Sequence, residues 1–283
     1  MKLLILDSGH NEYVSGKEAP DKSLREWEFN KDIQRRLKKR AEEHGLSVFL
    51  TNPSPDKKDE IGLTKRAQLA NDYWVSIGKP ESLFVSLHAN AYGSSFNDAR
   101  GTETYVAENA SSNSKKAAEL VQSSIYKMIK SIDSSAKDRG VKTSNFTVIY
   151  KAIMPVILIE YAFYTNRADL TLLKNNRAQL VEATMEGICK YFNIAYKPVN
   201  SENRQYDNCI VYSDEVDKII AQVLSWSLKN YIIVDSKVYN PSLAKQVFVV
   251  GSAASTIDGS IEFIGKDRWE TLNLVLEYTK TIN

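Results

Sequence analysis

Two histidines lie where the chain can present them to a metal ion. The chain has three histidines, and both His10 and His88 stand at the end of an apolar run, next to small or polar residues. A neutral imidazole is a good zinc ligand, and catalytic zinc commonly takes three protein ligands and leaves its fourth position to water. The metal lowers the pKa of that water to about 7. A histidine at a strand end is also often a plain hydrogen-bonded residue, so the two leave a zinc site undecided without a third ligand and a base.

Alternating strand and helix patterns through the first 195 residues would position these histidines. We predict helices at 25–45, 63–77, 114–132 and 168–192, with a short additional helix before the last as the alternative. We predict strands at 2–8, 46–52, 82–90, 101–108, 145–152 and 155–163. The alternation favours an α/β fold with a mostly parallel sheet flanked by helices. Sites in such sheets form at the carboxyl ends of strands. His10, His88 and Glu160 all come at or near predicted strand ends.

The composition is that of an ordinary globular protein. Of 283 residues, 43% are hydrophobic and 25% are charged, which is enough apolar material for a sizeable core. A net charge of +2 gives no argument for nucleic acid or a membrane surface as partner. No apolar stretch approaches the roughly 18 residues that span a bilayer, so we expect no membrane insertion. Cys189 and Cys209 fit no disulfide framework or zinc motif, which predicts free thiols and a reducing compartment.

Four segments carry a resemblance to a known family. They are LLILDSGH at 3–10, E-x-x-x-N at 26–30, SLHAN at 86–90 and PVILIEYAFYTN at 155–166. In this order and at these separations they resemble the zinc-dependent N-acetylmuramoyl-L-alanine amidases of the Amidase_3 type. Further matching positions are Arg66, Ala67, Ala70, Asn71, Gly101, Thr102, Glu103, Tyr105, Arg139, Gly140 and Val141. The resemblance covers residues 1 to about 193, and the combination is far more specific than any single segment.

The resemblance implies roles for four residues. His10, Glu26 and His88 would bind one zinc ion. Glu160 would be the catalytic carboxylate, although a structural ion pair is its alternative, since a carboxylate in an apolar strand needs a partner. Glu28 competes with Glu26, but the family's ligand precedes its asparagine by four positions, which selects Glu26. Positions 26 and 28 also point about 200° apart on a helix of 3.6 residues per turn.

Two motifs depart from the usual family pattern. The first reads DSGHNE at 7–12 where the family often has D-P-G-H-G-G, and the last reads EYAF at 160–163 where it often has E-L-G-F. Neither change removes a ligand or the acid, so they put fine substrate specificity in doubt and not the reaction. The third histidine, His44, precedes Gly45 at a predicted helix end, which predicts a structural contact with the last helix carbonyls.

Beyond residue 195 we predict a linker and a smaller α/β domain. Residues 196–208 are polar and without periodicity, as in a linker, and strand and helix patterns resume over 209–283. The segment G-x-x-R-W-E-T at 265–271 resembles the signature of clostridial cell-wall-binding repeats. The resemblance implies a wall-binding role for Arg268 and Trp269, and homo-oligomerisation through this domain as in some relatives. For Trp269 the alternative is a core position at helical spacing.

The resemblance to the amidases implies that the protein hydrolyses peptidoglycan at the amide bond between N-acetylmuramic acid and L-alanine. The architecture resembles endolysins of clostridial phages, which lyse the host cell. The first residues lack the apolar core of a signal peptide. We therefore expect synthesis in the host cytoplasm and action on the wall after release. The alternatives are a mother-cell autolysin of a spore former, a zinc peptidase or deacetylase acting on the same wall, and a wall-binding protein with an inactive catalytic domain.

Overall fold

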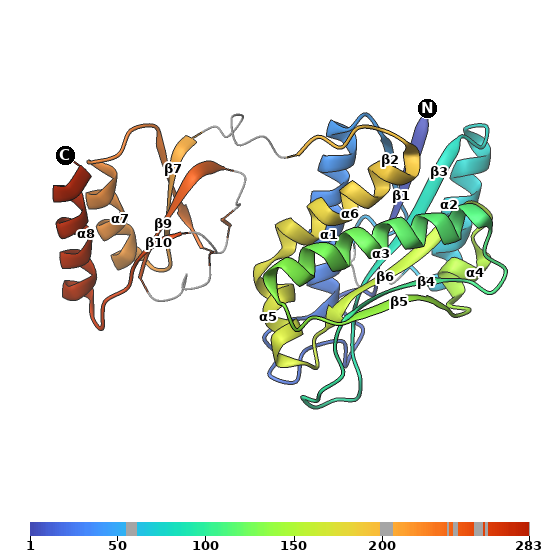
Figure 1. The fold of residues 1–283 in the computed structure, drawn as a ribbon, viewed down its shortest axis with the longest axis horizontal. Coiled ribbons are helices and arrows are strands. Elements are labelled where there is room, and N and C mark those ends of the chain that lie inside the picture. Colours follow the sequence, from blue (N-terminus) through green and yellow to red (C-terminus); the bar gives the residue numbers. More distant parts are fainter. Residues whose placement is uncertain are drawn as a thin grey trace. The chain divides into compact units, whose positions relative to one another are not determined.

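The chain divides into two units, Met1–Tyr196 and Lys197–Asn283, which are considered separately (Figure 1). The structure is a computed structural model, and it describes residues 1–54, 61–198, 206–236, 238–239, 243–251, 257 and 260–282. Most of the predicted linker, residues 199–205, lies outside the described residues. The last three residues of that predicted linker, 206–208, belong to the first strand of the second unit.

The first unit is built on a six-stranded sheet with the order β2-β1-β3-β6-β4-β5. Its strands are β1 (Lys2–Ser8), β2 (Ser47–Leu50), β3 (Glu81–Asn90), β4 (Thr102–Val106), β5 (Asp138–Thr143) and β6 (Val156–Phe163). Its helices are α1 (Glu26–Glu43), α2 (Leu63–Ser76), α3 (Ser112–Ile132), α4 (Thr147–Lys151), α5 (Arg167–Asn175) and α6 (Arg177–Phe192). Neighbouring strands are parallel except β4 and β6. The predicted mostly parallel α/β fold is confirmed.

Helices cover both faces of this sheet (Figure 1). On one face, Leu87 and Ile159 belong to a large core that also contains residues of α1, α3 and α6. On the other face, Phe84 and Leu158 pack in a smaller core with residues of α2 and α4. Successive side chains of a strand point to opposite faces. His88 of β3 and Glu160 of β6, which follow Phe84 and Leu158 at even spacings, therefore share the face of α2 and α4.

Two element predictions in this unit are wrong. The predicted strand at 145–152 is instead the helix α4, which packs against α2 and buries the adjacent Val148 and Ile149. The place beside β4 is taken by β5, a polar edge strand. The predicted helix at 168–192 is two helices, because α5 ends before Asn176 and α6 begins after it.

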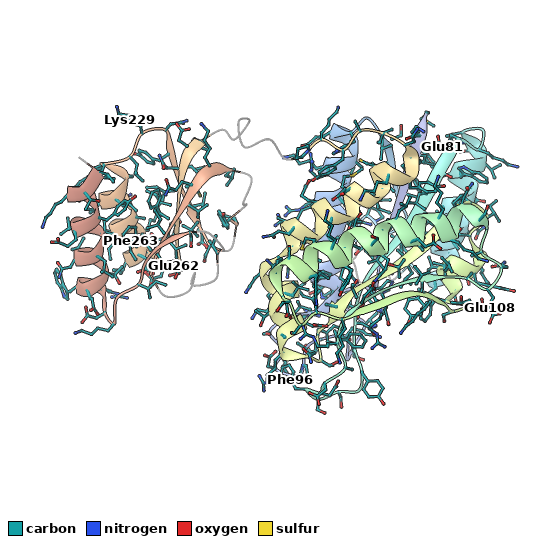
Figure 2. All side chains as sticks on the ribbon, viewed as in Figure 1. Glu81, Phe96, Glu108, Lys229, Glu262 and Phe263 are labelled. Atoms are coloured by element: carbon teal, nitrogen blue, oxygen red, sulfur yellow. The ribbon has the colours of Figure 1, made fainter. Side chains whose placement is uncertain are left out.

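The second unit has a four-stranded parallel sheet with the order β10-β9-β7-β8. Its elements are β7 (Tyr206–Tyr212), α7 (Glu215–Ser225), β8 (Tyr231–Asp235), β9 (Ala244–Val250), β10 (Ile261–Phe263) and α8 (Arg268–Ile282). The rings of Phe263, labelled in Figure 2, and Tyr278 of α8 lie 5.2 Å apart between centroids. Cys189 of the first unit and Cys209 of the second are both buried, and neither forms a disulfide bond within the described residues. Among the described helices, none is long and apolar enough to cross a membrane.

Candidate metal centre

A row of polar side chains crosses the carboxyl end of the first sheet. His88 of β3 is the register partner of Glu160 of β6, and Glu160 is in turn the partner of Glu103 of β4. Because directly opposed residues of neighbouring strands point to the same face, the three side chains follow one another across the sheet. His10 comes two residues after β1, and Glu26 is the first residue of α1. The fold therefore brings the predicted site residues to one edge of the sheet.

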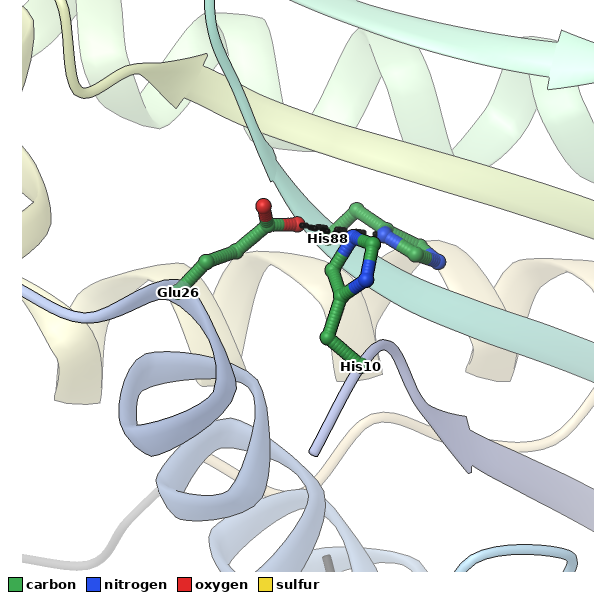
Figure 3. Close-up of side chains that lie close together, drawn as sticks. All are labelled: His10, Glu26 and His88. Carbon is green, nitrogen blue, oxygen red and sulfur yellow. Dashed lines mark hydrogen bonds and ion pairs between the residues drawn. The ribbon is translucent and has the colours of Figure 1, made fainter. Parts of the chain in front are cut away.

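Three of these side chains can hold a metal ion (Figure 3). Glu26 Oε1 lies 3.2 Å from His88 Nδ1 and 3.4 Å from His10 Nε2, and all three ligand atoms lie within 4.8 Å of one another. In a tetrahedral zinc site with bonds of about 2.0–2.1 Å, neighbouring ligand atoms are about 3.4 Å apart. The donor set and the two distances to the carboxylate oxygen therefore fit zinc.

Glu26 is a carboxylate that stays ionised although it is only 2% exposed. Burial by itself raises the pKa of Glu26, but hydrogen bonds and charge from His10 and His88 lower that pKa to about 2. Its Oε1 also accepts a hydrogen bond of 3.3 Å from the backbone N–H of Ala89. The competing residue, Glu28, is exposed and lies outside the metal-ligating group. At neutral pH, position 26 thus offers the negative charge that a metal ligand needs.

A chain of hydrogen bonds orients the ring of His88. Its Nε2 lies 3.2 Å from Ser86 Oγ, which donates to Asp7 Oδ2 at 2.9 Å. The other oxygen, Asp7 Oδ1, accepts from Thr51 Oγ1 at 2.7 Å and from Arg66 Nη1 at 3.3 Å. A chain that ends on a carboxylate favours the His88 tautomer with its proton on Nε2, which leaves the Nδ1 lone pair for a metal.

Side chains from three other segments fix the loop that carries His10. His10 has a φ of 60°, a left-handed conformation that is uncommon for a residue with a Cβ. The carbonyls of residues 8–10 all accept hydrogen bonds from side chains. Asn52 Nδ2 donates to the carbonyl oxygens of Ser8 and His10 at 2.9 and 3.1 Å, and Arg66 donates to the same two oxygens. Asn30 Nδ2 donates to the carbonyl oxygen of Gly9 at 3.0 Å. The unusual conformation is therefore held from several sides.

Glu160 places an ionisable carboxyl group beside the candidate metal ligands. Its Oε2 is buried and has no hydrogen-bond partner within the described part of the chain. Burial, followed by repulsion from Glu26 and Glu103, holds the pKa of Glu160 well above the usual range, and the charge of Lys17 opposes this only in part. Among the described residues Glu160 has no ion-pair partner, so the geometry gives no support to the alternative of a structural ion pair.

The two remaining groups of predicted residues have different surroundings. His44 Nδ1 lies 2.6 Å from the carbonyl oxygen of Arg40 at the end of α1, so the predicted structural contact is confirmed. Arg268 and Trp269 begin α8 of the second unit. Arg268 Nη2 lies 4.0 Å from Asp214 Oδ2, and Trp269 is 77% exposed. The alternative of a core position for Trp269 is therefore wrong.

Sequence reasoning missed the residues that support the ligands. The sequence shows Arg66 and Glu103 only as positions that match the family, and it indicates no role for Asp7, Thr51 or Ser86. The sequence does contain one indication of such residues. Asp7 and Ser86 interrupt strongly apolar strands, and a polar side chain inside a buried strand needs a hydrogen-bond partner. The identity of that partner depends on the register of neighbouring strands, which the sequence does not show.

Comparison with known proteins finds relatives that match most of the first unit. The Amidase_3 family model, N-acetylmuramoyl-L-alanine amidase, matches residues 4–190. The N-acetylmuramoyl-L-alanine amidase LytC of Bacillus subtilis (strain 168) is 32% identical over 192 residues, or 67% of this chain and 35% of LytC. The endolysin of Bacillus phage SPP1 is 29% identical over 211 residues, or 73% of this chain and 72% of the endolysin. The match thus spans about a third of LytC and most of the phage protein.

A solved structure is similar in fold as well as in sequence. The crystal structure of N-acetylmuramoyl-L-alanine amidase from Clostridium difficile 630 is 29% identical, with a TM-score of 0.59, over 68% of this chain and 97% of that chain. The 187 residues of the family match, 4 to 190, lie within the first unit and include His10, Glu26, His88 and Glu160. The chain therefore belongs to the Amidase_3 family of N-acetylmuramoyl-L-alanine amidases.

Proposed function

We propose that this protein hydrolyses bacterial peptidoglycan at the amide bond between N-acetylmuramic acid and L-alanine, with one zinc ion held by His10, Glu26 and His88. The observation that carries the proposal is the convergence of these three ligand atoms within 4.8 Å, beside a carboxyl group that is the register partner of one ligand. Membership of the amidase family and the similarity to LytC support the choice of bond.

The chemistry follows from the positions of the side chains. When bound, zinc supplies Lewis-acid polarisation of the scissile carbonyl and lowers the pKa of the attacking water to about 7. The carboxyl of Glu160 takes the proton of that water and returns it to the nitrogen of the leaving L-alanine. A carboxyl whose pKa lies well above the usual range suits both transfers near neutral pH. The unpartnered Oε2 is the atom we assign to this proton.

For the biological role we propose a phage endolysin that acts in host-cell lysis, with the second unit as a cell-wall-binding domain. The similarity to most of the SPP1 endolysin supports this role. The exposed indole of Trp269 supports a binding surface on α8. The similarity to LytC, an amidase of a bacterium, favours an autolytic amidase as the second candidate. Lysis of the host on expression with a phage holin, and none on expression alone, would separate the first role from the second.

Product analysis of digested peptidoglycan tests the reaction. We expect mass spectrometry to find free lactyl carboxyl groups on muramic acid together with new L-alanine amino termini. Intact links between muramic acid and alanine, with cuts elsewhere in the stem peptide or loss of acetyl groups, would show a peptidase or deacetylase instead. The Glu160→Gln variant should lose about 10²- to 10⁴-fold in rate, the usual range for removal of a general acid–base. Cleavage by that variant at the normal rate would contradict the mechanism.

A further inference from the structure

A buried carboxylate beside the candidate site is shared by two cations. Glu103 is 2% exposed, and its Oε2 accepts from Arg139 Nε at 2.5 Å and from Lys142 Nζ. Its Oε1 accepts from Tyr105 Oη at 2.9 Å and from Asn90 Nδ2 at 2.6 Å. These contacts hold the pKa of Glu103 below the usual range in spite of burial, so this carboxyl is ionised. Two positive charges against one negative charge leave the cluster with a surplus of one positive charge.

The cluster continues the polar row at the carboxyl end of the sheet. Glu103 of β4 is the register partner of Glu160, and Arg139 and Lys142 belong to β5, the next strand along. Since neighbouring strands lie about 4.8 Å apart, the backbone of β5 is about 10 Å from that of Glu160. Both cations reach back over β4 to Glu103, which shares the face of Glu160. The surplus charge therefore lies on the face where the amide would be cut.

The two cations have the geometry of an anion-binding pair. Each side chain is 34% exposed, so solvent or a ligand can reach it. Arg139 uses only Nε on Glu103, and its Nη1 and Nη2 have no hydrogen-bond partner among the described residues. The guanidinium carbon lies 4.9 Å from the centroid of the Phe163 ring, which limits its movement. A fixed guanidinium with two available N–H groups matches a carboxylate, and a neighbouring ammonium adds charge.

We propose that Arg139 and Lys142 form a subsite for the α-carboxylate of D-isoglutamate, the second residue of the stem peptide; this rests on the proposed amidase function. In an extended stem, that carboxylate lies two residue lengths, or about 7 Å, beyond the scissile carbonyl. This distance agrees with the positions of Arg139 and Lys142. Their backbone belongs to β5, about 10 Å from the backbone of Glu160, and their side chains extend toward β6 as far as Glu103. Glu103 acts as the positioning residue that holds the pair together.

Two soluble substrates that differ in one group test the subsite. Both are N-acetylmuramoyl tripeptides ending in L-lysine; one carries the free α-carboxylate of D-isoglutamate and the other the α-carboxamide. Charge-assisted hydrogen bonds predict a KM about tenfold or more lower for the carboxylate in the wild-type protein, with similar kcat. In Arg139→Gln and Lys142→Gln the KM ratio should fall toward one, while Arg139→Lys, which keeps the charge but loses the paired N–H groups, should give an intermediate ratio. The Lys116→Gln variant, with the same charge change on α3 of the opposite face, should keep the full ratio.

The KM ratio is measured within one protein sample, so partial unfolding of a variant does not mimic the result. Equal KM for the two substrates in the wild-type protein would overturn the subsite, as would a full ratio in both Gln variants. An equal rise in KM for both substrates in the Gln variants would also overturn it. Such a rise would show that the two cations bind a group common to both substrates, such as the carboxylate of the terminal lysine. No cleavage of either substrate would instead overturn the amidase function, and the subsite with it.

Discussion

At the scale of the residue, the candidate metal centre depends on a buried arginine that is not itself a ligand. The side chains of Arg66 and Asp7 are both fully buried and paired. Arg66 also donates to the carbonyl oxygens of Ser8, His10 and Ile61. Through Asp7 it supports the hydrogen bonds that orient His88, and through the two loop carbonyls it fixes the turn at His10. One side chain thus positions two of the three proposed ligands.

Arg66→Met should therefore weaken both the fold and the site. The variant leaves Asp7 buried without its cation, which typically costs 3–5 kcal/mol of unfolding free energy, and loss of support around a ligand typically costs 10- to 100-fold in metal affinity. Urea denaturation and competition with a zinc chelator measure the two effects. Lys65→Met, which also replaces a cation by methionine but at the exposed neighbouring position, should change neither the free energy of unfolding nor the zinc affinity. Wild-type stability in Arg66→Met would show that the buried pair is not needed.

Glu26→Gln tests which acidic residue of α1 is the ligand. The amide keeps the size of the side chain but removes the negative charge of Glu26, which contacts both His10 and His88. Zinc affinity should fall by more than about 100-fold, beyond the loss that supporting residues cause. Glu28→Gln removes the same charge two residues on, at an exposed position, and should bind zinc as the wild type does. The reverse order of the two affinities would assign the ligand to Glu28.

Some of these residues were predictable from the sequence and others were not. His10 and His88 were found because each ends an apolar run, which marks the carboxyl end of a buried strand. The ligand role of Glu26 could be predicted only from the spacing of the family motif. Nothing in the segment around Glu26 shows that the start of α1 lies next to the end of β3. The partners of Asp7 lie 44, 59 and 79 residues away, and only strand register and the packing of α2 bring them together.

At the scale of the element, the strands that form the site pack without room for an extra atom. A Cβ placed on Gly9 would lie 2.2 Å from His88 Cε1. The lack of a side chain at Gly9 therefore leaves the space that the ring of His88 occupies. The backbone of His88 cannot easily shift to relieve a clash, because Ala89 N–H donates to Glu26 and β3 pairs with β1 and β6.

Gly9→Ala should displace the ring of His88 and lower zinc affinity by 10-fold or more, a loss comparable to that of a supporting residue. Gly62→Ala is the matched control, because no atom of the described residues lies within 4 Å of a Cβ there and the φ of Gly62 is −59°. A crystal structure or histidine NMR shifts would report the ring position, and chelator competition the affinity. Unchanged zinc affinity in Gly9→Ala would show that β1 and β3 separate easily at this edge.

The element predictions failed where local pattern and tertiary context disagree. The segment 145–152 is rich in β-branched and aromatic residues, yet Thr147–Lys151 is helical, because as a helix it packs against α2 and buries the adjacent Val148 and Ile149. The strand β5 has mostly exposed, charged side chains and one strand partner, so no apolar alternation marks it. The same polar edge strand carries Arg139 and Lys142, which explains why sequence reasoning gave neither a role.

At the scale of the whole molecule, the chain combines a unit of the Amidase_3 family with a second unit that the family match does not include. We predict that Trp269→Ala weakens sedimentation with purified cell walls and leaves hydrolysis of a soluble muramoyl peptide unchanged. The indole is 77% exposed, so its removal should cost little stability. Trp226→Ala, at an indole 80% exposed after α7, is the matched control and should still sediment. Full sedimentation of Trp269→Ala would remove the proposed role of that residue.

The central claim, one zinc ion per chain serving amide hydrolysis, is tested most directly by titration of the metal-free protein with zinc. The protein is stripped with a chelator, and new L-alanine amino termini released from peptidoglycan are counted at each addition of zinc. We predict negligible release without zinc, a linear rise, and a plateau at one equivalent per chain, with no rise in Glu26→Gln. Full release by the stripped protein, or an equal rise in Glu26→Gln, would contradict the account.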